Sequence, residues 1–419
     1  MLKKRTSNRL RVSIGKLNFE NPFILAASPS TANGDFIRKA FAMGWAGAVI
    51  KTIKPDAMEI ADVSPRFSVL KDKNGNKIGF ENFELVGKKD TAYWLEEIQA
   101  IKREFPEKIL IASIMADQSA VAWKELAYKI ERAGADAIEL NFSCPHGMTE
   151  QGIGAVIGQS EKLSAMITGW VKETVRIPVI VKLTADVTDI KTIARQVAAA
   201  GADSIVAINT VQCLMGVDLD TMSPMPTVDG FSAYGGYSGY AVKPIGLRCV
   251  SQIYNEVDIP IYGVGGIGSW QDAVEYIAVG ANVVQVCTAV MLEGCQIIEP
   301  MLQGLEKYMK EKQIRNLESL RGIAARKIKT HTKLNRSYIA KAKVTNPKKC
   351  TACLKCQIAC SESGYNAIEY DGKSIHINQA TCDGCSLCSL VCPQNIIKMQ
   401  TTFSSTVETK TVAYNGRGG

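Results

Sequence analysis

The chain has 419 residues, of which 46% are apolar, and its mean hydropathy is close to zero. This composition predicts a globular protein with one large and one small domain. No apolar run approaches the roughly 18 residues that a membrane-spanning helix needs, and no apolar stretch follows the basic N-terminus as it would in a secretory signal. We therefore expect a cytoplasmic protein that does not associate with membranes.

The net charge of +8 is concentrated in one segment. Residues 312–349 contain 12 Lys and Arg and a single acidic residue, Glu318, so the rest of the chain carries a net charge of −3. The segment has few aromatic residues for base stacking. It is therefore interpreted as a connecting segment and not as a nucleic-acid site, with docking of an acidic partner or a cofactor phosphate as the alternative.

Eight short apolar strands are predicted before this segment. They lie near 23–26, 48–51, 109–113, 137–141, 179–182, 204–209, 260–263 and 283–286. Amphipathic helices such as 123–133 and 190–200 separate most of them, and a weak internal repeat ends several helices at Gly just before the next strand. Eight such units over about 290 residues predict a (β/α)8 barrel of the TIM type over 1–311, with an active site at the carboxyl ends of its strands. An open doubly wound sheet is the alternative, which the strand count disfavours.

A glycine-rich loop follows the seventh strand. Residues 263–268 match the dinucleotide fingerprint G-x-G-x-x-G, but no acidic residue ends the next strand, and a lone match is weak. In a barrel, the loops after strands seven and eight commonly hold a phosphate. We interpret Gly265, Gly266, Cys287 and Thr288 as backbone donors to the phosphate of FMN, with a tight structural turn as the alternative.

Polar residues close several of the predicted strands. Lys182 ends an apolar strand and needs an anionic partner, which could be a reduced flavin or Glu139 on the neighbouring strand. Asn82, Asn141 and Asn209 would suit a planar ligand with both amide N–H and C=O groups if they converge at the barrel mouth. Cys144 lies in a loop before a glycine-rich segment, where its thiol could serve as a proton donor or base, as a nucleophile, or have no reactive role. Four further cysteines are interpreted as packing residues: Cys213, Cys249, Cys287 and Cys295.

Eight cysteines cluster in the small C-terminal domain. A basic linker is predicted over 312–345, a ferredoxin-like α+β domain over 346–400 and a polar tail over 401–419. Each run has the spacing C-x2-C-x2-C-x3-C, which is typical of two 4Fe–4S clusters in which the fourth Cys of each run ligates the other cluster. The predicted ligand sets are Cys350, Cys353, Cys356 and Cys392 for one cluster, and Cys360, Cys382, Cys385 and Cys388 for the other. Zinc is the alternative, but it would leave the fourth Cys of each run without a role.

Together, residues 141–147, 182–184, 209–210 and 263–268 and the doubled cysteine motif resemble the dihydropyrimidine dehydrogenase family, most closely its bacterial catalytic subunit. The resemblance implies an FMN barrel that reduces the 5,6 double bond of uracil or thymine. It implies that Cys144 is the acid that protonates C5. It implies that the pyrimidine is held by Asn82, Asn141, Ser143, Asn209 and Thr210. It implies that FMN is held by Ala27, Ser28, Lys51, Thr52, Asn141, Lys182, Asn209, Gly239, Gly265, Gly266, Cys287 and Thr288.

The resemblance also implies that electrons arrive through the clusters from a partner subunit that carries FAD and binds NAD(P)H. We expect a hetero-oligomer, because no separate nicotinamide site is evident in this sequence. A dihydroorotate dehydrogenase-like flavoenzyme is the nearest alternative; such enzymes typically have Asn where this chain has His146. A non-catalytic electron-transfer subunit is the alternative of a different class.

Overall fold

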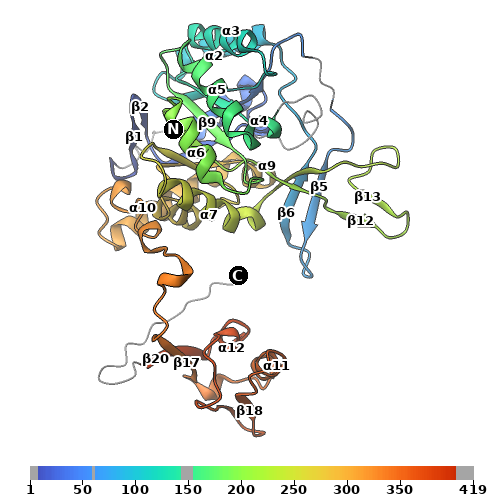
Figure 1. Cartoon of the computed structure of the whole chain (residues 1–419), viewed down its shortest axis with the longest axis vertical. Coiled ribbons are helices and arrows are strands. Elements are labelled where there is room, and N and C mark those ends of the chain that lie inside the picture. Colours follow the sequence, from blue (N-terminus) through green and yellow to red (C-terminus); the bar gives the residue numbers. More distant parts are fainter. Residues whose placement is uncertain (1–7, 59–61, 143–153, 403–419) are drawn as a thin grey trace. The chain divides into compact units, whose positions relative to one another are not determined.

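The computed structural model describes residues 8–58, 62–142 and 154–402. The chain divides into two compact units, Met1–Ile328 and Lys329–Gly419 (Figure 1). Among the described helices, none combines the length and the apolar character needed to cross a membrane.

A closed barrel of eight parallel strands forms the first unit, in the order β3, β4, β7, β8, β9, β10, β15 and β16. These strands span Phe23–Leu25, Gly47–Ile53, Ile109–Ile114, Ala137–Asn141, Val179–Leu183, Ser204–Ala207, Ile261–Val264 and Val283–Val286. The prediction of a TIM-type barrel is confirmed, and each predicted strand corresponds to one of them. The open-sheet alternative is wrong, because β16 pairs with β3 and closes the ring.

Helices follow the barrel strands and cover their outer side. They are α1 (Gly34–Met43), α2 (Thr91–Glu104), α3 (Ala120–Ala133), α4 (Ala155–Gln159), α5 (Glu161–Lys172), α6 (Ile190–Ala199), α7 (Lys243–Tyr254), α8 (Trp270–Ala278), α9 (Thr288–Glu293) and α10 (Ile298–Glu311). The repeated glycines end helices as predicted. Gly44 after α1 and Gly134 after α3 have φ angles of 112° and 94°, a left-handed conformation that favours glycine.

The barrel interior changes from apolar to polar along the strands. Ile24, Val49, Ile180 and Tyr262 belong to one buried cluster, which also contains residues of the hairpin β1 (Val12–Ile14) and β2 (Leu17–Phe19). The hairpin contacts this cluster near the amino ends of the strands. Toward the carboxyl ends, the buried side chains are instead Lys51, Ser113, Glu139, Asn141, Lys182 and Gln285. Such a polar layer is expected where a barrel carries an active site.

A second sheet, not among the predicted elements, forms from two insertions. One follows β4 and contains β5 (Phe67–Lys71) and β6 (Lys77–Asn82). The other follows β10 and contains β11 (Val211–Cys213) and β14 (Gly235–Ser238). Between these two strands in the sequence, β12 (Gly216–Asp218) and β13 (Ser223–Met225) form a hairpin that projects outward (Figure 1). The strand order β11-β14-β6-β5 joins the two insertions at the carboxyl end of the barrel. This sheet places Asn82 of β6 near that end.

The second unit is a small α+β domain, as predicted. The strands β17 (Ile339–Val344) and β20 (Ile397–Thr402) pair along their whole length, and β18 (Ile368–Tyr370) pairs with β19 (Ile375–Ile377). Two short helices complete it, α11 (Lys355–Glu362) and α12 (Leu387–Leu390). Its small core includes Ala342, Ile368, Ile375, Ile396 and Ile397.

The boundaries of the basic linker differ from those predicted. Residues 312–328 belong to the first unit, since Leu317 is buried and the amides of Gly322 and Ala324 donate to Ile277 and Ala278. At the other end, β17 already belongs to the second unit, and β20 extends into the predicted tail. Charge composition could not reveal these backbone hydrogen bonds, so the segment predicted as a 312–345 linker narrows to about 329–338.

Candidate active site

A cavity of about 240 Å³ opens at the carboxyl ends of the barrel strands. Its walls come from the strand ends, from the second sheet and from the loops after β15 and β16. Every described residue predicted to bind flavin or pyrimidine lines it: Ala27, Ser28, Lys51, Thr52, Asn82, Asn141, Lys182, Asn209, Thr210, Gly239, Gly265, Gly266, Cys287 and Thr288. The fold therefore brings these residues together from positions far apart in the chain.

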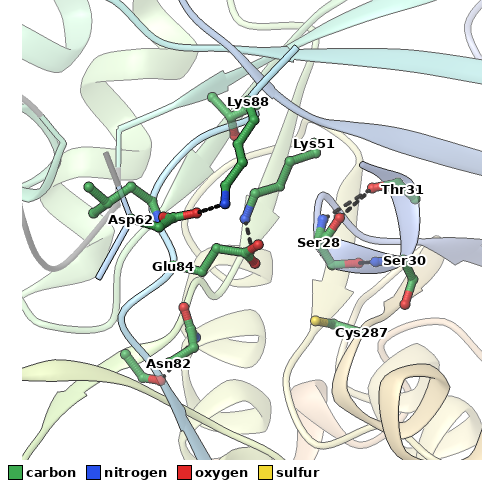
Figure 2. A network of polar contacts seen from close by, with 12 residues as sticks. Ser28, Ser30, Thr31, Lys51, Asp62, Asn82, Glu84, Lys88 and Cys287 are labelled. Atoms are coloured by element: carbon green, nitrogen blue, oxygen red, sulfur yellow. Dashed lines mark hydrogen bonds and ion pairs between the residues drawn. The ribbon is translucent and has the colours of Figure 1, made fainter. Parts of the chain in front are cut away.

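Two lysines reach the cavity from the barrel interior, and each pairs with a glutamate. Lys51 Nζ lies 3.1 Å from Glu84 Oε2, as Figure 2 shows, with side chains 10% and 12% exposed. Lys182 Nζ lies 3.6 Å from Glu139 Oε1 on the neighbouring strand, with side chains 6% and 0% exposed. The structural ion pair considered for Lys182 is thus present, and Lys182 also lines the cavity, so the two interpretations are compatible. In each pair the carboxylate offsets the free-energy cost of burying the ammonium group. Both lysines can therefore present positive charge to a ligand.

The three predicted asparagines converge on the cavity. Asn141 donates from Nδ2 to Thr52 Oγ1 at 3.0 Å, and Asn209 Nδ2 lies 3.4 Å from Asn141 Oδ1. Asn82 arrives on β6 and is held by a 3.2 Å hydrogen bond from its Nδ2 to the carbonyl of Gly236. These contacts fix the orientation of the amides, so one cavity wall offers both donors and acceptors.

The glycine-rich loop after β15 approaches other backbone closely. Gly266 has a φ angle of 70°, and a Cβ there would lie 2.8 Å from Lys243 Cβ and 3.0 Å from the carbonyl oxygen of Gly239. Asp272 braces the loop, because it accepts from the amides of Gly268 and Ser269 and pairs with Lys243 Nζ at 2.7 Å. Only glycine fits at position 266, because its φ angle is positive and other backbone lies where a Cβ would be.

Around this loop, Thr288 and Ser238 share a 2.8 Å hydrogen bond between hydroxyls. Ser28 caps a short 3-10 turn and contacts Ser30 and Thr31, as drawn in Figure 2. Burial raises the pKa of the Cys287 thiol, although Lys182 and Lys51 oppose the shift. The side chain of Cys287 packs against the buried cluster inside the barrel and also lines the cavity.

Two predicted site residues, Ser143 and Cys144, lie outside the described residues. The preceding residue, Phe142, is fully buried and packs edge-on against Trp123. The chain therefore leaves β8 from a firmly anchored point beside the cavity.

Several residues that shape the site were missed from the sequence. Glu84 gave no signal, since its partner Lys51 is 33 positions away. The local role of Asp272 could have been suspected from the capping box Ser269-x-x-Asp272 that begins α8, but its pairing with Lys243 could not. Glu81 and Cys213 form a buried pair in the second sheet, with Sγ 3.3 Å from Oε1; burial raises the pKa of both groups, that of Cys213 to about 12.

In the second unit, the eight clustered cysteines line two separate cavities. One is lined by Cys350, Cys353, Cys356 and Cys392, and the other by Cys360, Cys382, Cys385 and Cys388. These are the two crossed sets that the spacing predicts. Among the described His, Cys, Asp and Glu residues, no group of three or more is placed to hold a single metal ion. Four thiols at each cavity match the number of ligands of a 4Fe–4S cluster.

Comparisons with known proteins agree with this architecture. Residues 9–309 match the family model described as dihydroorotate dehydrogenase, and residues 342–399 match the 4Fe-4S dicluster domain. The NAD-dependent dihydropyrimidine dehydrogenase subunit PreA of Escherichia coli K12 is 38% identical over 396 residues, which cover 93% of this chain and 95% of that protein. The chain belongs to the dihydropyrimidine dehydrogenase family. It is an oxidoreductase with a flavoenzyme barrel and an iron–sulfur domain.

Two further relatives are similar to smaller parts of this chain. The chloroplastic dihydropyrimidine dehydrogenase (NADP(+)) of Arabidopsis thaliana is 38% identical over 336 residues, covering 78% of this chain and 79% of that protein. The dihydroorotate dehydrogenase B (NAD(+)) catalytic subunit of Methanothermobacter thermautotrophicus is 35% identical over 320 residues, covering 75% of this chain and 98% of that protein. The alignment with PreA covers more of the chain than either.

Proposed function

We propose that this chain reduces the 5,6 double bond of uracil or thymine, with electrons that enter through two 4Fe–4S clusters from a partner carrying FAD and binding NAD(P)H. When bound, FMN would supply the hydride that adds to C6. The observation that carries the proposal is the single cavity in which the amides of Asn82, Asn141 and Asn209 meet the buried Lys182.

The residues around the cavity fit FMN. Gly265 and Gly266 line the cavity together with Cys287 and Thr288, and the close packing of Gly266 against Lys243 fixes the loop, so its backbone would suit a phosphate. Lys51 and Lys182 would face the ring system and offset the negative charge that a reduced flavin gains. The remaining wall, from Ala27, Ser28, Thr52 and Gly239, would complete the flavin site.

The amide groups fit a pyrimidine base. Uracil presents two N–H donors and two carbonyl acceptors in one plane, so a side chain that both donates and accepts can pair with either edge. Asn82 and Asn209 would contact the ring together with Thr210 and Ser143. Asn141 would also contact the pyrimidine ring, and its amide is already oriented by the hydrogen bond to Thr52.

Cys144 would complete the chemistry as a general acid. Hydride addition at C6 leaves negative charge on C5 and O4, so a proton must reach C5. We expect Cys144→Ala to retain flavin and iron–sulfur absorbance and to lose at least about 100-fold in turnover, the lower range for a missing general acid. Turnover like that of the unmodified chain would refute this role.

The iron–sulfur domain would act as the electron entry. Two electrons and two protons are consumed per ring, and the domain has no substrate chemistry of its own. Eight thiols in one small domain also suit the reducing conditions of the cytoplasm. PreA is named as a subunit of an NAD-dependent enzyme, which supports an NAD(P)H-oxidising partner here.

A dihydroorotate dehydrogenase-like activity is the second candidate, since a relative so named is 35% identical over 98% of its length. That alignment covers only 75% of this chain, whereas the alignment with PreA covers 93%. An assay with orotate beside uracil separates the two. Flavin retention through purification separates both from a non-catalytic electron-transfer subunit.

A further inference from the structure

The paired strands β17 and β20 of the second unit have one apolar and one basic face. Ala342 and Ile397 lie in the domain core, with Val344 and Met399 packed against them. The residues that alternate with these form the opposite face, here called the basic sheet face: Ile339, Lys341, Lys343, Lys398 and Gln400. Of these, Ile339 is 42% exposed and Lys343 is also exposed.

The charge on this face is not balanced within the unit. Lys343 lies directly opposite Lys398 in the register of the two strands, an arrangement of like charges that destabilises a sheet. No ion pair joins Lys341, Lys343 or Lys398 to any acid that the structure describes. Acidic residues lie elsewhere, with Glu369 and Asp371 at the β18–β19 hairpin.

The basic sheet face and one cysteine cavity lie on opposite sides of the paired strands β17 and β20. Ala342 and Met399, on the inner side of the same strands, line the cavity of Cys360, Cys382, Cys385 and Cys388. The second cysteine run also touches β17 closely, because a Cβ on Gly384 would lie 2.1 Å from the carbonyl oxygen of Ala340. A protein that covers the basic sheet face would therefore sit close to this cluster.

We propose that the basic sheet face is the docking surface for an acidic electron-donor protein. The inference rests on the proposed function, in which a reduced flavoprotein supplies electrons. Each transfer oxidises the donor by one electron and reduces one cluster by one electron. Lysines without an acidic partner in the described part of the chain, of which Lys341 donates to the carbonyl of Gln379, lie beside the exposed Ile339 at the start of β17. Positive charge next to exposed apolar surface fits an interface with an acidic protein.

The same lysines could have two other roles, and each makes a different prediction. If they only offset the negative charge of the nearby cluster, they would change its reduction by every reductant, charged or neutral. If they bound nucleic acid, aromatic side chains for base stacking would be expected among them, and the five residues of this face include none.

The test compares reductants of different charge on the intact holoprotein. The variant K343E/K398E replaces one like-charged pair by another at the same register. The repulsion between the two strands is therefore similar in the variant and in the unmodified protein. The control is Lys373→Glu in the turn between β18 and β19. Bleaching of cluster absorbance is followed by stopped flow, with reduced flavodoxin as the acidic donor and photoreduced deazariboflavin as the neutral one.

We expect the double variant to react at least about tenfold more slowly with flavodoxin at low ionic strength, and the difference to shrink at high salt. Reduction by deazariboflavin, and the Lys373→Glu control with either donor, should match the unmodified protein. Equal rates with flavodoxin, an equal loss with both reductants, or an equal loss in the control would overturn the proposal. So would displacement of flavodoxin by single-stranded RNA at physiological salt. Uracil reduction driven by a viologen dye tests the proposed function separately.

Discussion

Replacing Lys182 by Met should destabilise the barrel unit strongly. The substitution leaves Glu139, whose side chain is fully buried, without the ammonium that lies 3.6 Å away. With an effective dielectric constant of about 20, two charges at that separation attract by about 4–5 kcal/mol. Breaking a buried pair by removing one partner typically costs about 3–5 kcal/mol. We therefore expect the free energy of unfolding to fall by about 3–5 kcal/mol.

Tryptophan fluorescence during urea unfolding measures this loss in the relevant unit. All five tryptophans lie in the first unit: Trp45, Trp94, Trp123, Trp170 and Trp270. The flavin-stripped chain is used, so that altered flavin affinity does not contribute. Lys191→Met is the matched control, because Lys191 and Asp189 lie 3.5 Å apart but are 40% and 42% exposed. An exposed pair of that kind contributes about 0–1 kcal/mol.

The double variant with Lys182→Met and Glu139→Gln removes both charges and keeps an amide where Gln285 donates to Glu139. Its stability should recover most of the loss, because no buried charge is left uncompensated. A loss with Lys182→Met no larger than that with Lys191→Met, or a double variant as unstable as the single one, would contradict a buried ion pair of this strength.

Three further predictions concern the loop, the clusters and the second sheet. Gly266→Ala forces a Cβ to within 2.8 Å of the facing helix, so FMN affinity measured by fluorescence quenching should fall at least about tenfold, whereas Gly268→Ala, whose nearest neighbour is at 3.5 Å, should bind normally. Cys392→Ala should remove about half of the bound iron and one of the two EPR signals of the reduced chain, although Cys392 lies in the second run; loss of the other signal would contradict the crossed ligand sets. Burial raises the pKa of Glu81, so the folded chain retains its proton above the ordinary pKa of glutamate, and stability falls as pH rises through that raised value. Glu81→Gln should flatten this fall in urea midpoints measured from about pH 4 upward; an unchanged slope would contradict it.

The barrel was predictable from sequence because its strands are short, apolar and buried on both faces, and glycines mark the helix ends before several of them. The second sheet was not, because β11 and β14 have only three and four residues, and β14 begins with two glycines and pairs with β6 of a distant insertion. Nothing local in either insertion reveals that pairing. The basic linker was placed by charge alone, which detects neither the burial of Leu317 nor the pairing of β17 with β20.

The site was partly predictable for a similar reason. In a parallel barrel all strand carboxyl ends meet at one face, so residues such as Asn141 and Lys182 can be grouped without knowing any distance. The crossed cysteine sets follow from spacing in the same way. The partners that orient these residues come from other elements, as Glu84 does for Lys51. A pair such as Lys51 and Glu84 has no sequence signature and required the structure, whereas Glu139 could be named as a partner of Lys182 because the two predicted strands are neighbours.

The central claim is that the cavity reduces a pyrimidine base. The most direct test is an anaerobic assay of the purified holoprotein with reduced benzyl viologen and, in parallel, uracil, thymine and orotate. The account predicts dye oxidation with uracil or thymine, formation of the 5,6-dihydropyrimidine, and little reaction with orotate. Reduction of orotate alone would contradict it.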